Sequence, residues 1–161
     1  MTGNRTMVED LADQYQRAFE MVYAVLDRIP ADKWTSGITE GCIPARVAYH
    51  TVEGLDFFFS GKPGSDFTWG YRFGGSWADL PPERLPSKEQ LLAYAHETEE
   101  KVGEFLGGME DKDLSAPFPL FDWAGKTKLG HLIYSLRHTM HHQGELAALQ
   151  VYSGVEGDSW K

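Results

Sequence analysis

Apolar residues recur at alternating steps of three and four near the start of the chain. In order, they are Val8, Leu11, Tyr15, Ala18, Val22, Val25 and Ile29. This spacing places apolar side chains on one side of an α-helix, and it is typical of helices that pack together in a bundle. Pro30 follows directly and cannot continue a helix. The pattern therefore predicts an amphipathic helix that ends near Ile29.

Two later segments repeat this periodicity. A second helix is predicted to begin at Ile43-Pro44, because proline is well tolerated in a first helical turn. A third is predicted to begin at Ser87, which forms a capping box with Gln90. The inward stripe of the second helix is Ile43, Val47, His50, Gly54 and Phe57, and that of the third is Leu91, Ala95, Thr98, Val102, Phe105 and Met109. A histidine thus occupies a position in the second stripe where a bundle expects an apolar residue.

The fourth helix is predicted from about Thr127 to about Tyr152, with Gly154 as its C-terminal stop. Its face around Leu129, Ile133, Leu136, Met140 and Ala147 is apolar. Between Thr127 and Ser153 the only charged side chains are Lys128, Arg137 and Glu145. One face must therefore pack in the bundle, while the other lines a site, a lid or a subunit interface. Together the four stripes predict an all-α fold, an antiparallel four-helix bundle in one domain over residues 1–161.

Two long segments, 61–86 and 110–126, show no regular periodicity. Their aromatic residues are Phe67, Trp69, Tyr71, Phe73, Trp77, Phe118, Phe121 and Trp123. Long irregular segments in a compact domain are usually functional. Two hypotheses therefore stay open: the segments form lids or pocket walls, or they cap the open end of the bundle.

The charge balance and the cysteine content narrow the classes of partner. The chain has 15 basic and 24 acidic residues, a formal charge of −9, and no run of Lys or Arg that would indicate nucleic-acid binding. Cys42 is the only cysteine, so an intrachain disulfide is impossible and a reducing compartment is indicated. No apolar run approaches the length of a membrane span. We expect a cytoplasmic protein that acts on a small molecule, with neither nucleic acid nor membrane as partner.

Three of the six histidines lie within five residues of the fourth predicted helix, at 138, 141 and 142. Because each helical residue advances the direction by about 100°, His138 and His142 point within about 40° of each other and His141 lies about 60° to the other side. Such an i,i+4 pair offers two imidazoles to one metal ion, and His50 can supply a third at about 2.0–2.2 Å. Three neutral imidazoles suit zinc, nickel or a similar metal and leave coordination positions open. His141 is expected to stand aside from the metal.

Other residues near this candidate site leave alternatives open. Glu53 shares a face with His50, and Glu145 shares one with His138; each could be an acid–base group, a metal ligand or an acceptor that orients a ligand. His131 is expected at the mouth of the site, and His96 on the surface of the third helix. In the alternative interpretation the histidines of the bundle are hydrogen-bonded core residues without a metal.

The string "HTMHHQGEL", with a single histidine almost ninety residues earlier, resembles the DinB/YfiT-like superfamily. The resemblance implies a four-helix bundle, often a homodimer, in which His50, His138 and His142 hold a divalent metal. The usual family string has arginine and glutamine where this chain has Gln143 and Glu145. Relatives include transferases and isomerases that use low-molecular-weight thiols, and proposed hydrolases.

These features favour a metal-dependent enzyme that activates water, as a hydrolase, or a low-molecular-weight thiol, as an S-transferase. The sequence does not decide between the two. A non-catalytic metal-binding or small-ligand-binding stress-response protein is the alternative, and a structural dimer with a vestigial site is a third possibility. The charge-poor fourth helix predicts a homodimer that buries apolar surface near the first or fourth helix.

Overall fold

The computed structural model describes residues 6–118 and 122–157, so Phe121 lies outside the described residues. Four α-helices dominate it: α1 (Met7–Arg28), α2 (Pro44–Phe58), α3 (Lys88–Gly107) and α4 (Lys128–Tyr152). Short 3₁₀ helices lie in the connections: η1 (Ala31–Lys33), η2 (Glu40–Cys42), η3 (Pro82–Arg84), η4 (Asp111–Ser115) and η5 (Asp122–Ala124). Within the described ranges there is no strand, only an isolated bridge between Pro117 and Thr127. The predicted all-helical fold is confirmed.

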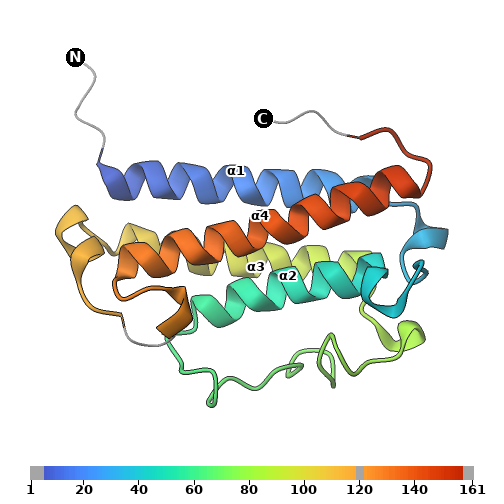
Figure 1. Cartoon of the computed structure of the whole chain (residues 1–161), viewed down its shortest axis with the longest axis horizontal. Helices are drawn as coiled ribbons and strands as arrows, with labels where there is room; N and C mark the ends of the chain where they lie inside the picture. Colours follow the sequence, from blue (N-terminus) through green and yellow to red (C-terminus); the bar gives the residue numbers. More distant parts are fainter. Residues whose placement is uncertain (1–5, 119–121, 158–161) are drawn as a thin grey trace.

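The bundle differs from a fully antiparallel one. α1 packs against α3 and α4, and α2 packs against the same two helices, so α1 and α2 lie on a diagonal. Figure 1 shows α1 and α4 running in one direction and α2 and α3 in the other. The neighbours α1–α4 and α2–α3 are therefore parallel, whereas α1–α3 and α2–α4 are antiparallel. The reason is the long 59–87 connection, which returns along α2 and starts α3 at the end of the bundle where α2 began.

Local signals set the helix starts. Thr6 and Glu9 form a capping box at α1, and Ser87 and Gln90 form the predicted one at α3. These side chains satisfy backbone N–H groups that have no partner inside the first turn. Pro44 lies in the first turn of α2, and the Thr127 side chain accepts from the Gly130 N–H at α4. Each start therefore lies within one or two residues of its predicted position.

The apolar stripes of α1 and α3 form much of the core. The predicted α1 stripe is buried except for Leu11, which is partly buried. The α3 stripe is buried from Leu91 to Val102, and its last members, Phe105 and Met109, are partly exposed. No described helix is long and apolar enough to cross a membrane.

Helix α2 is buried on all sides because the 59–87 connection covers its polar face. The Arg46 guanidinium, 5% exposed, donates to the carbonyls of Trp77, Ala78 (3.2 Å) and Leu80 (2.9 Å). One turn further along, the Tyr49 hydroxyl donates to the Gly75 carbonyl at 3.1 Å. Charge-assisted bonds to otherwise unpaired carbonyls are among the stronger ones in proteins. These contacts attach the connection to the helix along its length.

Helix α4 buries a different face from the one that its apolar residues predict. The face around Ile133 lies at the edge of the bundle, and Ile133 itself is 51% exposed. The buried face consists of His131, Leu132, Ser135, Thr139, Gln143, Leu146 and Gln150. Its hydroxyls do not lack partners: Thr139 Oγ1 donates to the Ser135 carbonyl at 2.9 Å, and Ser135 Oγ donates to the Leu132 carbonyl. Because the backbone of the same helix satisfies them, these small polar residues can be buried at little cost.

Candidate metal centre

The structure brings the three predicted ligands, His50, His138 and His142, together between α2 and α4. Their ring centroids are 5.1 Å apart for His50 and His138, 4.4 Å for His50 and His142, and 4.5 Å for the α4 pair. One nitrogen from each ring can be chosen so that all three lie within 4.8 Å of one another. Two histidines one turn apart on α4 thus face a third on the antiparallel neighbour, α2.

The carboxylate of Glu145 orients the ring of His142. Its Oε2 lies 2.7 Å from His142 Nδ1, and because a carboxylate only accepts, Nδ1 is the donor. A neutral His142 then carries its lone pair on Nε2, which lies 3.2 Å from His138 Nε2. Carboxylate–histidine pairs of this kind fix ligand tautomers in many metal sites. Glu145 is therefore an orienting partner of His142 here.

Gly54 makes room for the ring of His138. A Cβ at position 54 would lie 3.0 Å from His138 Cε1 and 3.6 Å from its Nδ1. The first contact is tighter than packed atoms normally allow, so the ring would have to shift by a few tenths of an ångström, whereas the second is an ordinary van der Waals contact. A glycine on the inward stripe of α2 therefore lets the two helices approach closely enough for the rings to meet. The sequence showed Gly54 on this stripe but gave no sign of its role.

Burial keeps the imidazoles of His50 and His138 neutral. Together with the neighbouring His142 and His138, which act in the same direction, burial lowers the pKa of His50 to about 3. Burial also lowers the pKa of His138 to about 4, with His142 and His141 acting in the same direction. Metal ligation requires the deprotonated imidazole. At neutral pH, both rings are therefore ready to bind a cation without releasing a proton.

The donor set fits a borderline divalent metal. Two nitrogens at 2.0–2.1 Å from one tetrahedral ion are about 3.3 Å apart, close to the separation of the two Nε2 atoms. In addition, Nδ1 of His50 is buried without a hydrogen-bond partner among the described residues. Buried polar atoms without partners are uncommon in folded proteins. This cluster can therefore hold a metal ion through three imidazoles.

The other acidic candidate, Glu53, faces the 59–87 connection. It is fully buried, and its Oε1 accepts from the Gly70 N–H at 2.6 Å and from the Tyr49 hydroxyl at 3.4 Å. Gly70 has φ +79° and a side chain there would overlap the backbone at Gly75, so only glycine fits this contact. Burial raises the pKa of Glu53 to about 7 despite these hydrogen bonds. Its observed partners give Glu53 a role in holding the connection, and its acid–base role stays a prediction.

The remaining histidines do not belong to the group of three converging rings. His141 is exposed, with Nε2 3.5 Å from Glu145 Oε1. His96 is an exposed residue of α3, as expected. His131, expected at the mouth of the site, is instead 2% exposed and bonded through Nε2 to the Phe58 carbonyl at 2.8 Å. The prediction for His131 is wrong because that part of α4 is closed by Phe58 and Phe118, whose rings pack against the imidazole.

Aromatic side chains border the cluster. The Trp77 ring, from the 59–87 connection, lies with its centroid 4.2 Å from that of His50. Phe58 and Tyr134 flank His138 at 5.2 and 6.3 Å, and Trp123 packs on Tyr134 at 4.9 Å. One ring of each long segment therefore lies near the cluster, Trp77 directly on His50 and Trp123 through Tyr134, and the two hypotheses for these segments stay predictions.

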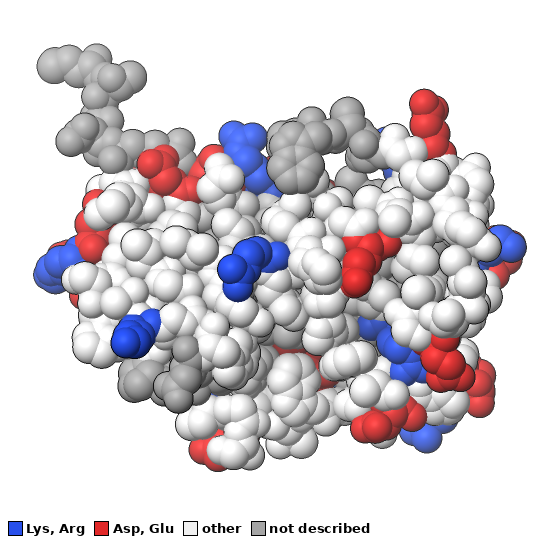
Figure 2. Space-filling view, viewed as in Figure 1, with Lys and Arg blue, Asp and Glu red and all other residues white. Residues whose placement is uncertain are grey.

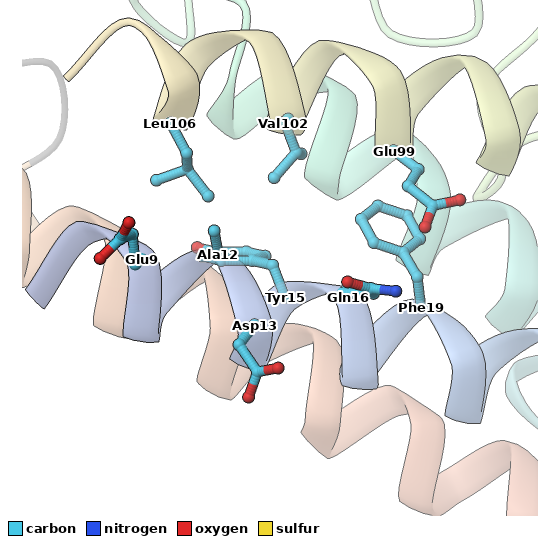
Figure 3. A pocket seen from close by; sticks show the side chains of 10 residues that line it. Glu9, Ala12, Asp13, Tyr15, Gln16, Phe19, Glu99, Val102 and Leu106 are labelled. Carbon is cyan, nitrogen blue, oxygen red and sulfur yellow. The ribbon is translucent and has the colours of Figure 1, made fainter. Parts of the chain in front are cut away.

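A cavity of about 400 Å³ between α1 and α3 lies away from this cluster (Figure 3). Tyr15, Phe19, Val102 and Leu106 line it, with acidic residues at its rim. Those carboxylates already have partners: Asp13 pairs with Arg17 at 2.9 Å, and Glu99 accepts from the Tyr23 hydroxyl at 2.6 Å. None of the predicted site residues lines this cavity.

The comparison with solved structures finds a similar fold. A conserved protein from Enterococcus faecalis superposes with a TM-score of 0.68, over 91% of this chain and 96% of that chain, at 13% sequence identity. The two chains share a fold. No family model and no curated protein sequence matches the chain. At this identity the likeness concerns the fold alone.

Replacing Gly54 with alanine tests the geometry of the cluster. The added Cβ should displace the His138 ring and weaken zinc binding about tenfold or more, as when a residue that orients a ligand is changed. Gly103→Ala in α3 is the matched control, because its Cβ meets nothing within 4 Å. That variant should gain about 0.5–1 kcal/mol in urea denaturation and bind zinc like the parent. Equal zinc affinity in both variants would contradict this arrangement.

Proposed function

We propose that this protein is a divalent-metal-dependent enzyme of the hydrolase or S-transferase type. The observation that carries the proposal is the convergence of His50, His138 and His142, with Glu145 fixing the tautomer of His142. Three protein ligands leave room for water or substrate, which is typical of catalytic and not of structural zinc sites. The resemblance to the DinB/YfiT-like superfamily supports the same conclusion.

A bound ion would supply a nucleophile near neutral pH by lowering the pKa of a water or of a low-molecular-weight thiol. The chain's own contribution is to orient the imidazoles and to move the proton. Glu145 is the better placed acid–base group, because 47% of its side chain is exposed beside the cluster. Glu53 is fully buried and bonded to Gly70 and Tyr49, so it is the weaker candidate.

The proposed substrate is a small apolar or aromatic molecule. Trp77 lies against His50, while Tyr134 and Trp123 lie on the His138 side, where Trp123 is 58% exposed. Flat aromatic walls favour such ligands, and few polar groups are needed to orient them. The single cysteine, Cys42, agrees with a cytoplasmic location, which we include in the proposal.

An activity screen tests the proposal and separates its two forms. Protein purified without an affinity tag would be freed of metal, loaded with zinc or nickel, and assayed on ester, amide and thiol-conjugation substrates. Turnover that needs both metal and an added thiol identifies an S-transferase, and turnover with metal alone identifies a hydrolase. A protein that holds the metal and a small ligand without turning any substrate over is the non-catalytic binder instead.

Glu145→Gln is expected to lower turnover by about a hundredfold or more while metal binding persists, the range for losing a general base. The amide oxygen can still accept from His142 Nδ1, so the ring keeps its orientation. Steady-state kinetics with metal analysis of the same sample measures both effects. Glu104→Gln, at an exposed position of α3, should change neither. Unchanged turnover in Glu145→Gln would remove this residue from the chemistry.

We further propose a homodimer formed through the apolar edge of α4. This edge comprises Leu129, Ile133, Leu136, Met140, Gly144, Ala147 and Val151, and contains no charged residue. Ile133 and Val151 are 51% and 55% exposed. Figure 2 shows that most of the face that α4 crosses is uncharged, with isolated basic and acidic side chains in its middle, although the chain is strongly acidic. Exposed apolar surface bordered by polar groups is typical of association sites.

Sedimentation at micromolar concentration is expected to show a dimer, and Ile133→Glu to show a monomer. The new carboxylate would be buried without a partner at the interface. Ile38→Glu is the control, since Ile38 is 61% exposed in a connection and not on this edge. A monomeric parent protein would contradict the proposed dimer.

A further inference from the structure

A second group of metal-binding side chains lies on the outer side of the three-histidine cluster. It consists of His141, His142 and Glu145, whose ligand atoms also lie within 4.8 Å of one another. Glu145 faces both histidines: its Oε1 is 3.5 Å from His141 Nε2, and its Oε2 is 2.7 Å from His142 Nδ1. The two groups therefore share His142, and they use opposite nitrogens of its ring, since Nε2 faces His138.

We propose that His141 and Glu145 form a second, weaker binding site for a borderline divalent cation such as zinc. The two residues are one helical turn apart on α4, so an imidazole nitrogen and a carboxylate face the same point. Both are established zinc ligands, and water completes the coordination. His142 Nδ1 is the third group at this position, but it carries the proton that bonds to Glu145.

The outer site is weaker than the inner one for two structural reasons. It supplies one imidazole and one carboxylate, where the inner site supplies three imidazoles. Its side chains are also exposed to solvent, His141 to 67% and Glu145 to 47%, and holding exposed side chains in one position costs conformational entropy. We expect its zinc affinity to be about a hundredfold below that of the inner site, because it has one protein ligand fewer.

The shared carboxylate couples the two sites. A cation bound to Glu145 makes its carboxylate a weaker acceptor for the hydrogen bond from His142 Nδ1. It also places a second positive charge beside the ion of the inner site. Occupation of the outer site should therefore weaken the inner one, and the reverse must hold to the same extent. If the inner site is catalytic, which rests on the proposed function, excess zinc inhibits the enzyme through this outer site.

Metal titration of the tag-free, metal-free protein tests the second site without any activity. Zinc binding followed by calorimetry and by competition with chelators should show a tight and a weaker class, one ion each. His141→Ala should lose only the weaker class. Glu145→Ala should lose the weaker class and also weaken the tight class about 10–100-fold, because His142 loses its orienting partner.

The chain offers a matched control in His96. Its Nδ1 lies 3.6 Å from Glu99 Oε2, and its side chain is 63% exposed, but that same oxygen accepts from the Tyr23 hydroxyl at 2.6 Å, whereas Glu145 directs Oε1 to His141 and Oε2 to His142. His96→Ala should leave both classes unchanged. A weaker class that survives in His141→Ala, or that disappears in His96→Ala, would overturn the proposal, as would a parent protein that shows only the tight class. If the parent protein shows only the weaker class and His141→Ala removes it, the outer site is supported and the inner site is contradicted.

Discussion

Alanine at position 50, 138 or 142 is expected to abolish tight metal binding, whereas alanine at 141 should retain it. Structural zinc binding is worth about 10–16 kcal/mol, so losing one of three imidazoles should cost about 3 kcal/mol or more, at least a hundredfold in affinity. The His141 ring packs against that of His142 with the centroids 4.9 Å apart, but its Nε2 lies 3.5 Å from Glu145 Oε1 and it is not one of the three converging rings. Zinc retained after dialysis, measured by mass spectrometry, gives the occupancy of each variant.

The contrast between His141 and His142 makes this experiment decisive. The two variants remove the same side chain from adjacent positions of one helix, so a general effect on α4 would appear in both. Urea denaturation of the metal-free forms checks that each variant folds. If His141→Ala loses the ion and His142→Ala keeps it, the assignment of the face is wrong. If all four variants bind metal like the parent, the three-histidine site does not exist and the proposed enzyme falls with it.

Asp56→Ala is expected to lower the free energy of unfolding by about 2–4 kcal/mol, for a reason unrelated to metal. Asp56 is 3% exposed and accepts from the hydroxyls of Tyr94 (2.7 Å) and Tyr71 (3.0 Å), and it pairs with Lys101. Without the carboxylate, the buried Tyr94 hydroxyl loses its acceptor, and an unsatisfied buried group costs about 1–3 kcal/mol. Lost bonds to Lys101 and Tyr71 add to this. Urea denaturation measures the change.

A second aspartate provides the control for this effect. Asp66→Ala changes an exposed residue of the 59–87 connection whose carboxylate accepts from the neighbouring Ser65 hydroxyl at 2.9 Å. Surface substitutions of this kind usually stay within about 0.5 kcal/mol. If both variants lose the same free energy of unfolding, the contacts of Asp56 with Tyr71, Tyr94 and Lys101 do not stabilise the fold more than an exposed aspartate does.

The sequence by itself determined the helices and the directions of side chains along each of them. Apolar periodicity, proline and capping boxes are local signals, and helix geometry converts residue spacing directly into direction. For this reason the start of α3 at Ser87 and the shared face of His138 and His142 could be predicted. The same geometry placed His141 beside that face and not on it. Each of these features depends on the local sequence and not on the position of another helix.

Only the tertiary structure decided which helices are neighbours, and therefore what His50 can reach. A four-helix bundle can place α2 beside or diagonal to α4, and the sequence pattern is the same in both cases. Here the 59–87 connection covers the polar face of α2, so Arg46 and Asp56 are buried in spite of their charge. The burial of Ser135 and Thr139 in place of Ile133 has a similar origin, because packing against several helices at once outweighs the hydrophobicity of one stripe. The meeting of the three rings depends on the close approach of α2 and α4 at Gly54, a contact between residues distant in sequence that no local pattern encodes.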